Sequence, residues 1–151
     1  MKHSTTNPTV SQQKRFSVMQ QIGCIICILD HGRHETPGDI HHILSGGKRI
    51  GHDATLYLTP WFHRGQPPNG WTIEKATEVL GPSMFHNPKE FKERYGTEAE
   101  LLEFQNELIK HFMKREQDDE EALKELIQVH KIESRIKVIN SVSDNGLLGI
   151  R

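Results

Sequence analysis

Short apolar runs on either side of a glycine-rich segment predict a small β-containing unit near residue 50. Residues 40–44 ("IHHIL") and 54–59 ("ATLYLT") predict two short strands, separated by the loop 45–53 ("SGGKRIGHD"). A helix is expected to begin after Thr59 and Pro60, because threonine caps helices well and proline suits the first helical turn. The order strand, loop, strand and short helix predicts a ββα unit.

The segment before this unit predicts one short helix. Residues 1–10 are polar and contain an Asn-Pro step, so we expect them to be disordered. Ser11 is expected to cap a helix through residues 12–22, and Gly23 is expected to end it. Two short apolar pieces then surround a Cys-x-x-Cys turn.

The C-terminal half is predicted to be helical. Residues 72–81 and 87–96 each resemble a capped helix that ends at glycine, and Thr97 opens a longer amphipathic helix whose apolar stripe packs in the core. After the acidic run "EQDDEE", a last helical stretch carries a second apolar stripe, formed by Val129, Ile132, Ile136 and Ile139. That face needs a partner, either the domain itself or a second chain. The whole pattern predicts an α+β fold.

Composition narrows the class of protein only slightly. A chain of 151 residues fits one domain with an appended element. Residues 1–70 contain seven Lys/Arg and four Asp/Glu, a net +3, whereas residues 71–151 contain twelve and sixteen, a net −4. The N-terminal half is therefore the better candidate for contacting phosphate. The sequence shows no apolar run of about 18 residues and no secretory leader, so we expect no membrane contact and a cytoplasmic location.

The chain contains two cysteines, Cys24 and Cys27. A two-residue gap between cysteines in a reducing compartment suggests half of a metal site or a redox pair rather than a structural disulfide. A thioredoxin-like redox motif follows a strand in a βαβ pattern, which is not predicted here. A metal site is therefore favoured.

Four histidines fall within 23 residues: His41, His42, His52 and His63. Neighbouring side chains on a strand point to opposite faces, so His41 and His42 are expected to do different work. A metal-assisted nuclease needs such a division, because one group holds a divalent ion and another deprotonates the attacking water. The remaining scattered histidines are expected to be surface or hydrogen-bonded residues; they include His3, His86, His111 and His130.

Several segments together resemble a known nuclease family. They are "GCIIC", "IHHILSGGKRIGHDAT", "PWFHRG", "GPS" at 81–83 and "FKERYG" at 91–96. The arrangement resembles the HNH, or ββα-metal, nuclease motif, and more closely the Ref-type RecA-dependent nucleases of phages and prophages. The resemblance implies an HNH-like domain over residues 11–114, with its ββα core flanked by helices. Residues 115–151 are expected to form a C-terminal helical extension and tail.

The resemblance also implies roles for the histidines. His42 would be the general base, and His41 and His63 would hold a catalytic Mg²⁺ or Mn²⁺. A typical HNH asparagine is missing, so His52 or Asp53 would do the orienting work. The implied activity is endonucleolytic cleavage of DNA.

The same resemblance implies partners and contacts. Lys48, Arg49 and Arg64 would contact phosphate, which positions DNA without reading its sequence. The DNA would be nicked or cut while bound in a RecA filament during phage recombination. A catalytically decayed DNA-binding or RecA-binding accessory protein is the alternative. The C-terminal helices could also join copies into a homo-oligomer.

One departure from the family concerns zinc. The family has "LCPWHHRG" where this chain has "LTPWFHRG", so Thr59 and Phe62 replace two groups that would complete a zinc tetrahedron with the two cysteines. Two alternatives remain open. Either His31 and His34 join the cysteines as zinc ligands, or the zinc is lost and Phe62 fills the volume.

Overall fold

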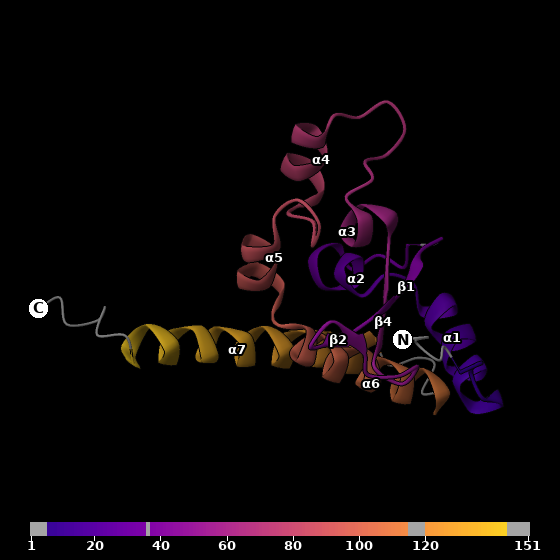
Figure 1. Cartoon of the computed structure of the whole chain (residues 1–151). Coiled ribbons are helices and arrows are strands. Elements are labelled where there is room, and N and C mark those ends of the chain that lie inside the picture. The colour runs from indigo at the N-terminus through magenta and orange to yellow at the C-terminus, as the bar shows by residue number, and fades with distance from the viewer. Residues whose placement is uncertain (1–5, 36, 115–119, 145–151) are drawn as a thin grey trace, which may run out of the picture.

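The structure, a computed structural model, describes residues 6–35, 37–114 and 120–144, with the side chains of 120–122 and 136–144 left out. Helices surround a small antiparallel sheet of two strands, and two further short strands form a second sheet (Figure 1). The predicted mixed α+β class is confirmed. Within the described ranges, none of the helices combines the length and the apolar character that crossing a bilayer requires.

The central sheet consists of β1 (Asp39–His42) and β4 (Thr55–Leu58), which pair antiparallel. His41 lies opposite Leu56, and His42 lies opposite Thr55. Helix α3 (Pro60–Arg64) follows β4 directly, with Pro60 in its first turn. The two predicted strands and the short helix are confirmed, although both strands are shorter than the apolar runs suggested. Strand β4 is buried along its whole length.

The glycine-rich segment between the strands is more ordered than predicted. It forms a second hairpin from β2 (Leu44–Ser45) and β3 (Lys48–Arg49). Gly46 and Gly47 connect them with φ angles of 58° and 77°. Only glycine adopts two successive positive φ angles readily, and a two-residue hairpin turn of this kind requires both. The hairpin places two basic side chains at an exposed tip.

The N-terminal helices correct two predictions. Helix α1 (Val10–Ile22) is capped by Thr9, whose hydroxyl accepts from the Gln12 amide while the Gln12 side chain accepts from the Thr9 amide. The predicted cap at Ser11 is wrong, because this reciprocal pair satisfies two free backbone amides when the cap lies two residues earlier. Helix α2 (Ile25–His31) replaces the two predicted apolar pieces. Short apolar runs do not distinguish a buried helix from strands.

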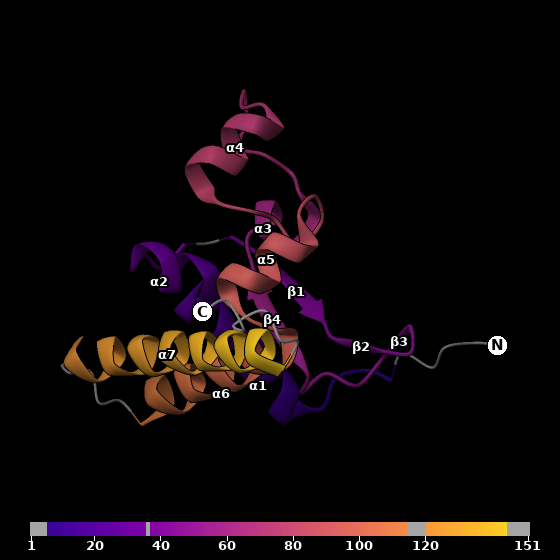
Figure 2. The same cartoon turned by 90° about the vertical axis from the view of Figure 1, so that its left-hand side faces the viewer.

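The remaining helices lie where the sequence predicted them. They are α4 (Ile73–Leu80), α5 (Pro88–Tyr95), α6 (Glu98–Met113) and α7 (Glu120–Asp144). Both views show α7 running along α6 (Figure 1, Figure 2). Leu123, Leu126 and Ile127 pack against the core. His130 is buried and its Nε2 lies 2.9 Å from the Tyr95 carbonyl oxygen, as expected of a hydrogen-bonded histidine.

The two described residues of the predicted stripe of the last helix do not pack against the domain. Val129 and Ile132 are 52% and 46% exposed, so the face that packs is a neighbouring one. Ile136 and Ile139 lie outside the residues whose side chains are described. Several other expectations lie wholly or partly outside the described residues: disorder at 1–5, the histidine at 3, and the start and tail of the extension at 115–119 and 145–151. Of the predicted disordered segment, residues 6–9 lead directly into α1.

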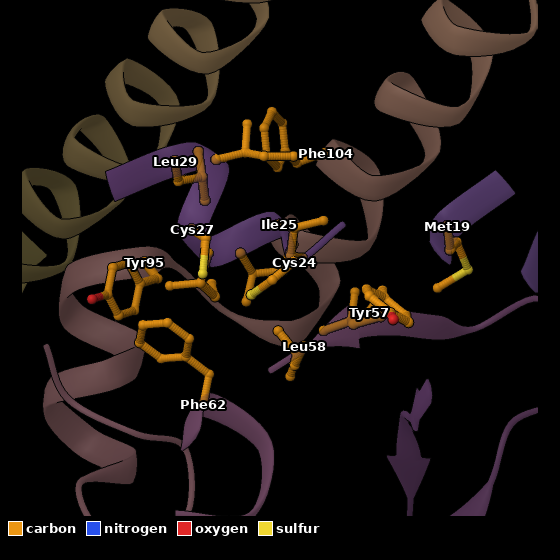
Figure 3. Close-up of a cluster of buried hydrophobic side chains, with 14 of the residues drawn as sticks. Met19, Cys24, Ile25, Cys27, Leu29, Tyr57, Leu58, Phe62, Tyr95 and Phe104 are labelled. Carbon is orange, nitrogen blue, oxygen red and sulfur yellow. The ribbon is translucent and has the colours of Figure 1, made fainter. Parts of the chain in front are cut away.

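The core gathers around α2, β4 and α3. Figure 3 shows Cys24 and Cys27 beside Leu58, Phe62 and Tyr95. The Phe62 ring meets the Tyr95 ring edge to face, with 5.9 Å between centroids. Tyr57 and Trp61 are also buried in this core. An apolar cluster therefore fixes the sheet and α3, while His41, His42 and His63 on these elements are only half-buried.

Candidate active site

His41 and His63 form the first pair of imidazoles. His41 lies on β1 and His63 on α3, and their ring centroids are 5.0 Å apart. A carboxylate contacts each ring: Glu98 Oε1 lies 3.2 Å from His41 Nε2, and Asp39 Oδ2 lies 3.0 Å from His63 Nδ1. Asp39 and His41 share a face of the strand because they are two residues apart. Each of the two neighbouring imidazoles thus has a carboxylate partner of its own.

One carboxylate oxygen of Asp39 contacts two side chains of this cluster. The same Oδ2 that contacts His63 also accepts from Arg64 Nε at 2.7 Å. Partial burial favours the neutral acid, but the hydrogen bonds from His63 and Arg64 outweigh it and lower the pKa of Asp39. The carboxylate therefore stays charged and orients both side chains.

His42 and His52 form the second pair, separate from the first. His42 Nε2 lies 3.0 Å from His52 Nδ1, and the two ring centroids are 5.2 Å apart. Phe16 of α1 meets both rings edge to face, at 5.8 Å from His52 and 6.4 Å from His42. The sequence predicted different work for His41 and His42, and the structure gives each ring its own partners. The two neighbours do not share one cluster of side chains.

The surroundings of His42 suit a base. Burial, and after it the charge of Arg49, lower the pKa of His42 below its ordinary value. The imidazole is therefore largely neutral near pH 7 and has a lone pair available for a proton.

The basic hairpin tip adjoins this second pair. Lys48 and Arg49 are exposed, and they line a cavity of about 630 Å³ together with His42 and His52. Arg64, also predicted to contact DNA, lies instead with the first pair through Asp39. The predicted basic residues thus do not form one patch. Lys48 and Arg49 lie near the pair His42 and His52, and Arg64 lies near the pair His41 and His63.

Comparison with known protein families identifies the family of this chain. The family model described as "Recombination enhancement, RecA-dependent nuclease" matches residues 8–110. The chain belongs to this family. Membership in the RecA-dependent nuclease family implies a nuclease role in recombination, with DNA as substrate. No curated protein and no solved structure matches the chain.

The orienting residue of this RecA-dependent nuclease was left open between His52 and Asp53. The structure brings only His52 to His42. Asp53 is exposed and accepts from Gln12 Nε2 at 3.1 Å. Of the two candidates, His52 is therefore the one that lies within hydrogen-bond distance of the His42 ring.

The zinc residues predicted for this nuclease are not gathered into one site. Cys24 and Cys27 are buried side by side, and hydrogen bonding to Cys24 together with burial raises the pKa of the Cys27 thiol. His34 Nδ1 lies 2.7 Å from the Ile22 carbonyl oxygen, and exposed His31 lies 3.7 Å from Asp30. Phe62 is 1% exposed and occupies the core beside the thiols. The thiol pair fits an apolar core better than a four-ligand zinc site.

The first histidine pair fits a divalent ion by its donor chemistry. Imidazole nitrogen and carboxylate oxygen are both ligands of divalent metals in proteins. Over the described part of the chain, no group of three or more His, Cys, Asp or Glu side chains is arranged to hold a metal. A Mg²⁺ site commonly uses only one or two carboxylates, completed by water and substrate phosphate, so fewer than three protein ligands can be enough.

Three side chains of this site were not predicted from the sequence. Asp39 is two residues from His41, and the strand period could have placed both on one face. Glu98 and Phe16 come from helices far away in the sequence, and no local signal connects them to the histidines. Only the packing of α6 and α1 against β4 brings them there.

Proposed function

We propose that this chain is an HNH-type, divalent-metal-dependent DNA endonuclease that nicks or cuts DNA held in a RecA filament. The proposal rests on one observation: the two neighbours His41 and His42 enter two different clusters. One contains a second histidine and carboxylates, and the other contains a histidine of lowered pKa beside a basic tip. This is the division that metal-assisted phosphodiester hydrolysis needs.

In the proposed reaction, His41 and His63 would hold the ion, which would supply electrostatic stabilisation of the charge that develops on the scissile phosphate. Asp39 orients His63 and Arg64 through its shared oxygen. His42 takes a proton from water, the water oxygen bonds to phosphorus, and the P–O bond to the leaving oxygen breaks. The leaving oxygen then takes a proton from solvent.

The basic residues hold the DNA backbone in this proposal. Lys48 and Arg49 project from the hairpin beside His42, and Arg64 lies beside His63. Contacts of this kind position the duplex and carry no sequence information. We therefore assign selection of the target to the RecA filament, and the description of the family as RecA-dependent supports this assignment.

The family match also supports the proposed domain organisation. It ends at residue 110, close to the boundary expected at 114. We assign residues 11–114 to the nuclease domain and 115–151 to a helical extension. The exposed Val129 and Ile132 would be its contact face toward a second copy.

The test uses supercoiled plasmid with Mg²⁺ or Mn²⁺, with and without RecA and ATP. The wild-type protein is expected to nick only DNA that carries the filament. His42→Ala should lower the rate by about 10²- to 10⁴-fold, the usual contribution of a general base. His111→Ala, near the C-terminal end of α6 and at the opposite end of that helix from Glu98, is the matched control and should nick like the wild type.

Equal nicking by the wild type and His42→Ala would refute the assignment of the base. Binding of filament-coated DNA with no nicking under any metal would instead support the accessory protein without catalysis.

A further inference from the structure

A chain of hydrogen bonds runs from the backbone of the N-terminal segment to His42. The Thr6 carbonyl oxygen lies 2.7 Å from His52 Nε2. The other ring nitrogen of His52, Nδ1, lies 3.0 Å from His42 Nε2. Three groups from three separate segments are thus joined end to end.

The direction of this chain follows from the first acceptor. A carbonyl oxygen can only accept, so His52 Nε2 must carry the hydrogen. In a neutral imidazole one nitrogen donates and the other accepts, so His52 Nδ1 is bare and accepts from His42 Nε2. The hydrogen of neutral His42 then sits on Nε2. Its Nδ1 is left as the nitrogen with a free lone pair.

We propose that His52 and the Thr6 carbonyl are positioning residues that fix His42 in the tautomer whose Nδ1 is the base. This inference rests on the proposed nuclease function and names the atom that takes the proton. After proton transfer, His42 Nε2 still donates to His52, so the hydrogen bond also supports the imidazolium. The N-terminal segment before α1 becomes part of the active site.

The surrounding contacts hold His52 in place for this task. Its backbone carbonyl accepts from the Thr55 hydroxyl at 2.9 Å, and Thr55 pairs with His42 across the sheet. Arg15 donates to the Thr55 hydroxyl and carbonyl, at 3.2 and 2.9 Å. Phe16 packs against both imidazoles. The relative position of the two rings is therefore set by α1 and β4 and not by the hairpin tip.

The wrong tautomer would place a hydrogen where the water must deliver one. An enzyme whose histidine base loses its tautomer partner keeps its geometry and still loses most of its rate. A purely structural role for His52 would give a different result, because it would lower stability or DNA affinity. The two roles can therefore be separated.

The first experiment needs neither metal nor DNA. Ring nitrogens of ¹⁵N-histidine-labelled protein are assigned by NMR at a pH where both rings are neutral. The expected result is a single tautomer for each ring, with the hydrogen on Nε2 of both His42 and His52. His52→Leu should convert His42 to a mixture of tautomers. A hydrogen on Nδ1 of either ring in the wild type, or an unchanged His42 signal in the variant, overturns the proposal.

The second experiment measures single-turnover nicking of filament-bound plasmid. His52→Leu is expected to be slower by about tenfold to a hundredfold, less than the about 10²- to 10⁴-fold lost with the base itself. His52→Asn should recover most of the rate, because its side-chain oxygen can accept from His42 Nε2. Thermal unfolding and metal-free DNA affinity should match the wild type, as they should in the control His111→Leu.

The outcomes separate this inference from the function on which it rests. If the wild type nicks DNA and His52→Leu nicks it equally fast, the positioning role fails and the nuclease stands. If His52→Leu and His52→Asn lose DNA affinity alike, His52 is a structural or DNA-binding residue instead. If the wild type never nicks DNA, the proposed function fails. The NMR assignment of the ring nitrogens still tests whether the hydrogen-bond chain from Thr6 through His52 to His42 exists.

Discussion

The cysteine pair and the histidine pairs contain similar ligand types in opposite surroundings. Cys24 and Cys27 lie in an apolar core beside Phe62, and the nearby His31 and His34 turn to other partners. His41 and His63 remain partly exposed, and each contacts a carboxylate. Residue type alone therefore does not make a metal site. The polarity of the surroundings and the convergence of the donors decide it.

Removing the divalent metal should have the largest of the predicted effects, which is the loss of DNA nicking at the histidine site. EDTA is expected to abolish nicking of filament-bound plasmid, and added Mn²⁺ should restore it, because the proposed reaction needs an ion at the phosphate. His63→Ala should remain inactive at the same Mn²⁺ concentration. His31→Ala, a histidine of the cysteine region, should be restored like the wild type. Nicking that persists in EDTA would remove the metal from the mechanism.

Replacing Phe62 by alanine tests whether its ring fills the apolar core beside the two cysteines. Phe62→Ala should lower the free energy of unfolding by about 3–5 kcal/mol, since it removes a buried ring and leaves a cavity. Urea titration followed by circular dichroism measures this loss. The exposed Phe85→Ala is the matched control, with an expected change within about 0.5 kcal/mol. A loss of less than about 1 kcal/mol would mean that Phe62 does not fill the core.

Metal analysis sharpens the same point. We expect the purified wild type to contain no tightly bound zinc, because its thiols lack two further ligands. The double variant Thr59→Cys, Phe62→His returns the two family residues and should bind one zinc per chain, measured by inductively coupled plasma mass spectrometry. One tightly held zinc in the wild type would favour His31 and His34 as the missing ligands.

Neutralising the hairpin tip should give the smallest effect. Lys48→Ala with Arg49→Ala is expected to weaken binding to all DNA sequences alike, and to flatten the slope of log K against log salt by about 2. Fluorescence anisotropy at several salt concentrations measures both quantities. Lys110→Ala, whose lysine pairs with Glu107 on α6, is the control. An unchanged slope would exclude these residues from the phosphate contact.

Local signals predicted most of the elements. Glycine and threonine marked the ends of the helices, and the apolar runs marked β1 and β4. Where two local solutions competed, the sequence was ambiguous: Thr9 with Gln12 outcompeted Ser11 as the cap, and a buried five-residue run became α2. Both outcomes depend on contacts with other residues, which the helix or strand propensity of a single residue does not include.

The sequence by itself determined that His41 and His42 would differ, because side chains alternate along any strand. It also determined the turn at Gly46 and Gly47, whose positive φ angles only glycine adopts readily. Tertiary structure alone decided which partners each histidine meets. Glu98, Phe16 and Thr6 reach the site from distant segments because α6 and α1 pack against one small sheet. Such long-range contacts follow from burying a shared apolar core, and no local pattern records them.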